Sequence, residues 1–235
     1  MKALILAAGK GTRMLPLTVD MPKVLIEING KPFLWYVLEH LRKAGISEFG
    51  IIVNHKKEKI KDFLEQYNLH AFLIDQPEPL GTGHAVKQAQ SFCGNDHFII
   101  VSGDNLYSVQ DLQFIQKKDA FCYIAGTEVP DWQKYGVLVT GGEWLIKIME
   151  KPKEFVGNLV NTGLYQCTAD IWAALDKIKI SPRGEYEFTD ALSILAVSGK
   201  VKILKLQDYW LDLGCTEDIV KIEQFMKEKG NKIAT

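Results

Sequence analysis

Short apolar runs alternate with longer amphipathic stretches over residues 1–125, and this alternation limits the fold more than any other feature of the chain. Buried strands are predicted for the apolar runs Ala3–Ala7, Phe49–Asn54, His70–Asp75, Phe98–Ser102 and Ala120–Ala125. Strands that alternate with helices favour a parallel sheet covered on both faces. We therefore expect an α/β protein with a Rossmann-like mixed, mainly parallel sheet flanked by helices. Ligands of such sheets bind beyond the carboxyl ends of the strands.

The amphipathic stretches predict the helices between these strands. Leu34, Val37, Leu38 and Leu41 recur at helical spacing before Gly45. Two further helices are expected over Glu58–Tyr67 and from Thr82 through Phe92.

The pattern changes after about residue 130. A hairpin is predicted from Gly136–Val139 and Trp144–Met149, with Gly141 and Gly142 at its turn. The remaining predicted elements are strands at Leu159–Tyr165 and Val201–Leu206, and helices near Ala169–Asp176, Thr189–Val197 and Glu217–Lys227, and the segment Tyr209–Gly214 before the last helix is given no type. No linker divides the chain, so residues 1–235 are interpreted as one domain. Its second half, residues 126–235, adds antiparallel strands over the crevice formed by residues 1–125.

Charge and cysteine content exclude several classes of function. The 235 residues carry a formal net charge of −1, which does not fit a general nucleic-acid binder. No apolar run approaches the ~20 residues of a membrane helix, and the start of the chain lacks the pattern of a secretion signal. The four cysteines are widely spaced, which argues against a zinc site or a disulfide framework. A cytoplasmic protein is expected.

A glycine-rich basic loop follows the first predicted strand. Its small residues allow backbone N–H groups to approach an anion closely. The loop residues Leu6, Ala7, Ala8, Gly9, Gly11 and Thr12 are predicted to bind the phosphates of a ligand. Lys10, Arg13 and Lys23 add three positive charges against the one negative charge of Asp20. A polyphosphate ligand is therefore expected, and a basic surface loop is the alternative.

Two other phosphate-binding motifs fit this loop poorly. A P-loop requires Ser or Thr after Gly-Lys, whereas Gly11 follows Lys10 here. A dinucleotide-binding loop requires a third glycine at the start of a helix, where this chain has Met14 and, two residues later, Pro16.

The loop resembles the motif of sugar-1-phosphate nucleotidylyltransferases, Leu-x-Ala-Ala-Gly-x-Gly-Thr-Arg followed by Pro-Lys. The resemblance extends along almost the whole chain, to the enzymes that uridylylate N-acetylglucosamine-1-phosphate and those that uridylylate or thymidylylate glucose-1-phosphate. Matching segments are Gln76–Ala85, Ser102–Asp104, Glu150–Pro152, Asn161–Gly163, Gly184–Asp190 and Trp210–Gly214. The resemblance implies a nucleoside triphosphate and a sugar 1-phosphate as substrates, with Mg²⁺ as cofactor. It makes residues 1–125 the nucleotide-binding half and residues 126–235 the sugar-binding half.

The segment Gln76–Ala85 is similar to the family's pyrimidine-reading segment. The amide of Gln76 carries both an acceptor and donors, so it can pair with the imide edge of uracil or thymine. Gly81 would offer backbone groups to the same base, and Thr82 is expected to cap the following helix. His84 is not assigned a role, because the implied reaction does not need it.

Two acidic residues are candidates for a metal site. Asp104 follows a buried strand and the flexible Gly103, which is assigned to the nucleotide side, and Asp212 lies between Trp210 and Gly214. Capping of a helix by Asp104 and a turn at Asp212 are the alternatives. The resemblance makes the two carboxylates a Mg²⁺ pair, which suits a cation that also binds phosphate oxygens and water.

The sugar side is assigned mainly on the resemblance. Glu150 can accept hydrogen bonds from hydroxyl groups, and Lys151 can pair with the sugar's phosphate. Asn161 suits a hydroxyl or acetamido group, and the backbone of Gly136 can lie against the sugar.

The implied reaction is attack of the sugar phosphate on the α-phosphorus of the triphosphate, with release of pyrophosphate. The nucleophile is already an anion, so no general base is needed, and the difficulty is repulsion. Two unit charges 4 Å apart interact by about 4 kcal/mol at an effective dielectric of 20. Arg13 is therefore assigned to the β- and γ-phosphates, and Lys23 to the α-phosphate and the sugar phosphate.

Other functions stay open on the sequence alone. They are a cytidylyltransferase for a small phospho-alcohol such as phosphocholine, a mannose-1-phosphate guanylyltransferase, a non-catalytic nucleotide-sugar-binding module and, least favoured, a nicotinamide dehydrogenase. The chain stops soon after the last predicted helix, so no acetyl transfer is expected. The sugar, the choice between UTP and dTTP, and the number of subunits are left open.

Overall fold

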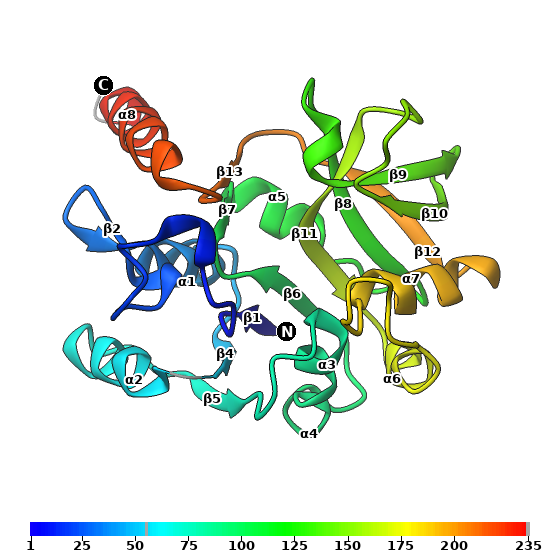
Figure 1. Cartoon of the computed structure of the whole chain (residues 1–235), viewed down its shortest axis with the longest axis horizontal. Coiled ribbons are helices and arrows are strands. Elements are labelled where there is room, and N and C mark those ends of the chain that lie inside the picture. The colour runs from blue at the N-terminus through cyan, green and yellow to red at the C-terminus, as the bar shows by residue number, and fades with distance from the viewer. Residues whose placement is uncertain (55, 234–235) are drawn as a thin grey trace.

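A nine-stranded sheet forms the centre of the protein in the computed structural model, which describes residues 1–54 and 56–233, with side chains through residue 229 (Figure 1). The strand order is β5-β4-β1-β6-β11-β8-β12-β10-β9. The strands of the sheet are β1 (Lys2–Leu6), β4 (Glu48–Val53), β5 (Phe72–Asp75), β6 (Phe98–Ser102), β8 (Cys122–Glu128), β9 (Gly136–Gly141), β10 (Trp144–Glu150), β11 (Leu159–Cys167) and β12 (Val201–Lys205).

The sheet is mixed and mainly parallel in strand direction, as predicted, since all its strands except β10 and β11 run the same way. Strands β5, β4, β1 and β6 pair in parallel, and β12 pairs in parallel with β8. Strand β11 runs antiparallel between β6 and β8, and β10 runs antiparallel to both β12 and β9. The antiparallel strands of the second half are therefore continuous with the parallel sheet.

Helices cover both faces because alternate strand residues point to opposite sides. In β1, Ala3 and Ile5 join the core that contains buried residues of α1 (Phe33–Lys43), α2 (Lys57–Gln66) and α5 (Val109–Phe114). Leu4 joins the opposite core, which contains residues of the helices α3 (Thr82–Lys87), α4 (Gln90–Cys93), α6 (Asp170–Leu175) and α7 (Phe188–Val197). The last helix, α8 (Thr216–Ile233), lies beside β2 at one end of the molecule (Figure 1).

Several short elements were not predicted. Strands β2 (Glu27–Ile28) and β3 (Lys31–Pro32) form a small hairpin, and β7 (Asn105–Tyr107) pairs with β13 (Trp210–Asp212) outside the main sheet. Short runs of two or three residues give no periodicity that a sequence pattern could reveal.

The helix expected from Thr82 through Phe92 is divided into α3 and α4. The backbone N–H groups of Gln88 and Ala89 bond to the carbonyls of Ala85 and Val86, three residues back. These tighter bonds end the first helix, so the prediction of one continuous helix is wrong.

Strand register brings the predicted site together at one edge of the sheet. Leu6 at the end of β1 lies opposite Ser102 of β6 and Ile52 of β4. The glycine-rich loop and the segment Gly103–Asp104 therefore leave the sheet side by side. Among the described residues, no helix has both the length and the apolar content that crossing a bilayer requires.

Candidate active site

The glycine-rich loop is built on close backbone contacts. Gly11 has a φ of +65°, and a Cβ there would lie 3.0 Å from Cγ2 of Thr18, so a side chain would be both strained and crowded. Position 103 also requires a glycine, here because of crowding alone: a Cβ on Gly103 would lie 2.9 Å from the carbonyl oxygen of Leu6. Around Gly9, in contrast, no atom lies within 4 Å of such a Cβ, which leaves open space above the loop.

This open space belongs to a cavity of about 530 Å³ at the mouth of the sheet. The predicted site residues that line it are Leu6, Ala7, Ala8, Gly9, Gly11, Thr12, Arg13, Lys23, Gln76, Gly81, Thr82 and Asp104. Lys10, Ser102 and Glu185 also contribute to its wall. The loop residues, Gln76, Gly81 and Asp104 thus share one cavity, although they come from four separate segments, whereas the predicted site residues Gly103 and Asp212 are not among those that line it.

A buried ion pair joins the basic loop to the end of β6. Lys23 begins the 3₁₀ turn Lys23–Leu25, is 9% exposed, and donates from Nζ to Oδ2 of Asp104 at 2.7 Å. An ammonium held this far from water requires such a partner. Asp104 does not cap a helix, because Ser108 caps α5.

Asp212 reaches the same place through the pairing of β13 with β7. It lies opposite Asn105, and the next residue, Leu213, donates its N–H to the carbonyl of Asp104 at 2.9 Å. Burial and the charge of Asp104 raise the pKa of Asp212 to about 6, while Lys23 and Arg13 oppose this shift. The two bases and two acids therefore form one electrostatic cluster.

Asn105 and Trp210 orient Asp104, and neither was predicted as a site residue. The indole Nε1 of Trp210 donates to Oδ1 of Asn105 at 2.6 Å, and Nδ2 of Asn105 donates to Oδ1 of Asp104 at 3.0 Å. Both carboxylate oxygens of Asp104 thus have a donor. The sequence places Asn105 next to Asp104, but the role becomes visible only when β7 and β13 pair.

The two carboxylates fit a divalent cation that also binds substrate. Asp104 and Asp212 repel each other, as the raised pKa of Asp212 indicates, and a cation between them would relieve this repulsion. Among residues 1–54 and 56–233, no cluster of three or more His, Cys, Asp or Glu could hold a metal ion. The pair of Asp104 and Asp212 suits Mg²⁺, which commonly uses one or two carboxylates together with phosphate oxygens and water.

The base side of the cavity is held by contacts between distant segments. Gly81 has a φ of +101°, and a Cβ there would lie 2.6 Å from the carbonyl oxygen of Tyr186. Thr82 does not cap α3 as predicted. Gly81 occupies the N-cap position, and the hydroxyl of Thr82 instead accepts from the N–H of Phe188 at 3.0 Å.

The predicted sugar residues are not among the described residues that line this cavity. Gly136 faces Glu150, since a Cβ on Gly136 would lie 2.9 Å from Oε2 of that carboxylate. Arg183, which was not predicted, donates to Oε1 of Glu150 at 3.4 Å and to Oε1 of Glu187 at 2.7 Å. Glu150 thus has a cationic neighbour, which lies one residue before the matching segment Gly184–Asp190.

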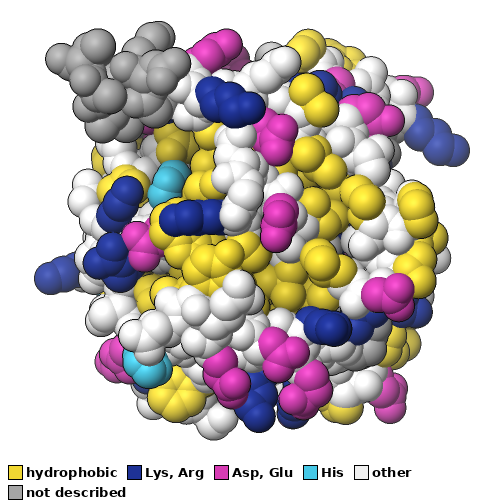
Figure 2. All heavy atoms as spheres, turned by 90° about the vertical axis from the view of Figure 1, so that its left-hand side faces the viewer, with side chains coloured by type: hydrophobic (Ala, Val, Ile, Leu, Met, Phe, Trp, Pro, Cys, Tyr) yellow, Lys and Arg dark blue, Asp and Glu magenta, His cyan; other side chains and the backbone are white. Residues whose placement is uncertain are grey.

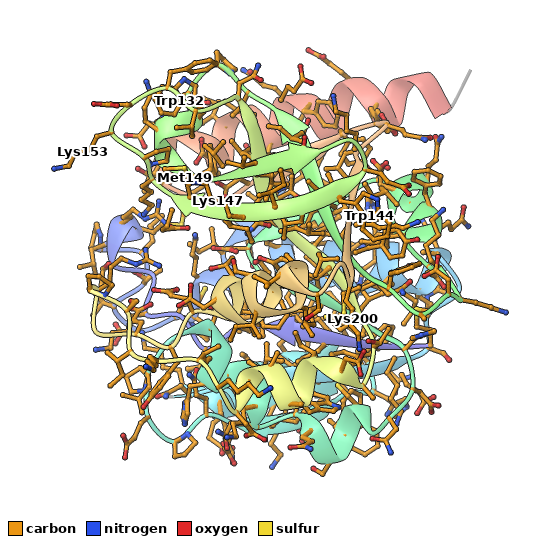
Figure 3. All side chains as sticks on the ribbon, turned by 90° about the vertical axis from the view of Figure 1, so that its right-hand side faces the viewer. Trp132, Trp144, Lys147, Met149, Lys153 and Lys200 are labelled. Atoms are coloured by element: carbon orange, nitrogen blue, oxygen red, sulfur yellow. The ribbon has the colours of Figure 1, made fainter. Side chains whose placement is uncertain are left out.

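Lys151 and Asn161 have different surroundings. Lys151 is exposed and has a φ of +44°. The amide of Asn161 is engaged locally, since it donates to the hydroxyl of Tyr165 at 2.7 Å and accepts from the N–H of Gly163 at 3.0 Å. Two residues beyond Lys151, the side chain of Lys153 points away from the body of the molecule (Figure 3).

Comparison with known sequences now gives the family. Residues 2–229 match the family described as "Nucleotidyl transferase". The chain belongs to this family.

Curated members of the family include proteins of two lengths. The chain is 38% identical over 232 residues to the "Bifunctional protein GlmU" of Methanocaldococcus jannaschii, a match that covers 98% of this chain and 55% of the relative. It is 35% identical to "UTP--glucose-1-phosphate uridylyltransferase AglF" of Haloferax volcanii, with 97% and 98% of the two chains covered. The chain therefore spans about half the length of the bifunctional relatives it matches.

Solved structures of nucleotidyl transferases have the same fold. A UDP-glucose pyrophosphorylase complexed with UDP-glucose is similar with a TM-score of 0.87 and 25% identity, over 97% of this chain and 98% of the other. A putative glucose-1-phosphate thymidylyltransferase from Bacillus anthracis gives a TM-score of 0.84 at 24% identity, over 96% and 94% of the two chains. The predicted fold class is confirmed.

In this nucleotidyl transferase, the loop after Arg13 is held by hydrogen bonds at the buried Thr18, although much of its apolar surface is exposed. Leu15, Leu17 and Val19 are all about half exposed. Figure 2, which views the side of the molecule that carries β2, shows hydrophobic side chains gathered over the middle of that face. The hydroxyl of Thr18 donates to the carbonyl of Gly11 at 2.8 Å, and Nζ of Lys56 donates to the carbonyl of Thr18 at 2.7 Å.

Replacement of Lys56 with methionine should therefore loosen residues 15–21 without unfolding the protein. Loss of the charged donor removes a hydrogen bond worth about 1.5–3 kcal/mol. We expect faster amide hydrogen exchange in this loop, measured by mass spectrometry, with the exchange of β1 and β6 unchanged. Lys59→Met is the matched control, because Lys59 is exposed on the same helix. Equal exchange in the two variants would contradict this role for Lys56.

Proposed function

We propose that this chain transfers a uridylyl or thymidylyl group from UTP or dTTP to glucose-1-phosphate or N-acetylglucosamine-1-phosphate. The products are a nucleotide sugar and pyrophosphate. The observation that carries the proposal is the cluster of Arg13, Lys23, Asp104 and Asp212 at the glycine-rich cavity. The Haloferax volcanii relative, to which this chain is similar over nearly its whole length, is named a UTP–glucose-1-phosphate uridylyltransferase, and this name supports the same reaction class.

The residues of the cluster perform the transfer mainly by lowering repulsion. Both substrates are polyanions, and the transition state gathers more charge on the phosphorus and on the leaving pyrophosphate. Backbone N–H groups of the loop and the guanidinium of Arg13 would bind the β- and γ-phosphates. The ammonium of Lys23 would neutralise the α-phosphate and hold the attacking sugar phosphate in line with it.

Mg²⁺ is the cofactor that the acidic pair would hold. Asp104 and Asp212 would bind it from the protein side. When bound, the ion would supply positive charge to the phosphate oxygens and help to orient the two substrates. Lys23 occupies one oxygen of Asp104 in this structure, so the ammonium would exchange that contact for substrate phosphate when the cation binds.

The base side and the sugar side complete the proposal. Gln76 and Gly81 would read the pyrimidine, whereas Gly136, Glu150, Lys151 and Asn161 would contact the sugar phosphate. A cytidylyltransferase, a mannose-1-phosphate guanylyltransferase or a non-catalytic module are outcomes that the following experiment can reveal.

Pyrophosphate release from a panel of substrate pairs tests the proposal. The panel crosses UTP, dTTP, CTP, ATP and GTP with glucose-, N-acetylglucosamine- and mannose-1-phosphate and with phosphocholine, each with and without Mg²⁺. We expect release with UTP or dTTP together with one of the first two sugars, and only when Mg²⁺ is present. Preference for another pair, or binding without release, would contradict the proposed function.

The variant Lys23→Ala should lose turnover because it lacks the ammonium that meets the transferred phosphate. We expect kcat to fall by at least about 10²-fold, the range for lost electrostatic stabilisation of a transition state. Lys57→Ala is the control, since Lys57 forms an exposed ion pair with Asp75. Turnover near the unmodified level in Lys23→Ala would remove Lys23 from the mechanism.

The variant Asp104→Asn should respond differently to the metal. The amide keeps the shape of the side chain but lacks the negative charge that binds the cation, so we expect activity to require at least about tenfold more Mg²⁺. Circular dichroism should show an unchanged fold. An unaltered Mg²⁺ titration would contradict the assignment of Asp104 as a metal ligand.

A further inference from the structure

The amide of Gln76 is already fixed on its nitrogen side. Gln76 is buried, and its Nε2 donates to the carbonyl oxygen of Gly81 at 3.0 Å. The same nitrogen lies 3.2 Å from Nδ1 of His84. An amide nitrogen has two hydrogens and no acceptor capacity, so these two contacts use both of its hydrogens. The group that Gln76 can offer to a ligand in the cavity is therefore its oxygen, Oε1.

This arrangement determines the tautomer of His84. Because Nε2 of Gln76 can only donate, Nδ1 of His84 must accept, and the ring proton of the neutral imidazole lies on its Nε2. That nitrogen is 3.2 Å from the side-chain amide of Gln88, which ends the same helix. In the structure the nitrogen of the Gln88 amide faces the ring and also donates to the carbonyl oxygen of His84 at 3.3 Å, so Gln88 is not an acceptor that fixes the ring. The chain of hydrogen bonds that bears on the ligand therefore consists of His84, Gln76 and Gly81.

The direction of this chain matters for the choice of base. Uracil and thymine carry a hydrogen on N3, whereas cytosine has a lone pair at that position. An amide oxygen accepts from the N3–H of uracil or thymine, but it repels N3 of cytosine. A reversed Gln76 amide would suit cytosine, yet it would set its oxygen against the carbonyl of Gly81, only 3.0 Å away. Two facing acceptors are unfavourable, and the loss of the bond to His84 adds to that effect.

We propose that His84 is a positioning residue, which fixes the Gln76 amide with its oxygen toward the base and so selects uracil or thymine over cytosine. This inference rests on the proposed function, because it assumes that Gln76 meets the base of the triphosphate. His84 acts through Gln76 and does not touch the reacting atoms. Its Nδ1 accepts from the buried amide of Gln76, and this is the contact through which it would hold the orientation of that amide.

The test compares two substitutions of His84 that differ in one acceptor. His84→Phe keeps a ring without an acceptor, whereas His84→Asn places an amide oxygen near the position of Nδ1. The measured quantity is the ratio of kcat/KM for UTP to kcat/KM for CTP, with the same sugar 1-phosphate. We expect His84→Phe to lower this ratio about fivefold, as the loss of one neutral hydrogen bond would. His84→Asn should keep the ratio within about twofold of the unmodified protein.

Two further variants separate positioning from general damage. His84→Leu repeats the comparison if the phenylalanine variant does not fold. Lys87→Ala, on the same helix with an exposed ion pair to Asp176, should leave the ratio unchanged. A purely structural role for His84 would lower kcat/KM for UTP and CTP by the same factor. Such an equal loss, no change in the ratio, or failure of His84→Asn to preserve it would overturn the inference.

The unmodified protein separates this inference from the function on which it rests. If it uses UTP or dTTP in preference to CTP and His84→Phe leaves the ratio unchanged, only the inference about His84 fails. If it uses a purine triphosphate or releases no pyrophosphate, the proposed function fails, and the inference fails with it.

Discussion

The contact between Lys23 and Asp104 is the interaction on which the site depends. It joins the end of the basic loop to the segment after β6, across 81 positions of sequence, with 2.7 Å between the charged atoms. A partly buried ion pair of this kind contributes little net stability on its own, but removal of Asp104 would leave the buried ammonium of Lys23 without its partner. The ion pair contributes by positioning: it holds the ammonium of Lys23 beside the carboxylate of Asp104, at the point where the phosphates of both substrates would meet.

The alternation of apolar runs and amphipathic helices predicted the main sheet because buried strands and covering helices have clear periodicities. The bounds of β4, β6, α6 and α7 lie within one or two residues of the prediction. The pattern could not reveal that β11 enters the sheet antiparallel between β6 and β8, since strand order depends on long-range pairing. It also could not reveal the break between α3 and α4, which depends on two local hydrogen bonds.

Some residues of the candidate site could be predicted from the sequence, whereas others could not because their roles depend on tertiary contacts. Loop residues such as Gly11 and Arg13 were identifiable because their types and spacing suit an anion. Asn105 and Arg183 were missed because an amide or a guanidinium acquires a role only through its partners. The expected cap at Thr82 was wrong on the same grounds, since its hydroxyl bonds to Phe188, more than a hundred residues away. Residue type indicates what a side chain can do, whereas tertiary contacts decide which partner it has.

The hydrogen bonds that join residues 80–83 to residues 186–188 have a consequence for redesign. Tyr186 donates its N–H to the carbonyl of Leu80 and accepts from the N–H of Gly83, so the base-facing turn and the segment behind the sugar side share backbone bonds. A graft that exchanges either turn with that of another family member would break a matched interface. Chimeras intended to accept a new nucleotide or a new sugar should therefore transplant the two segments as one unit.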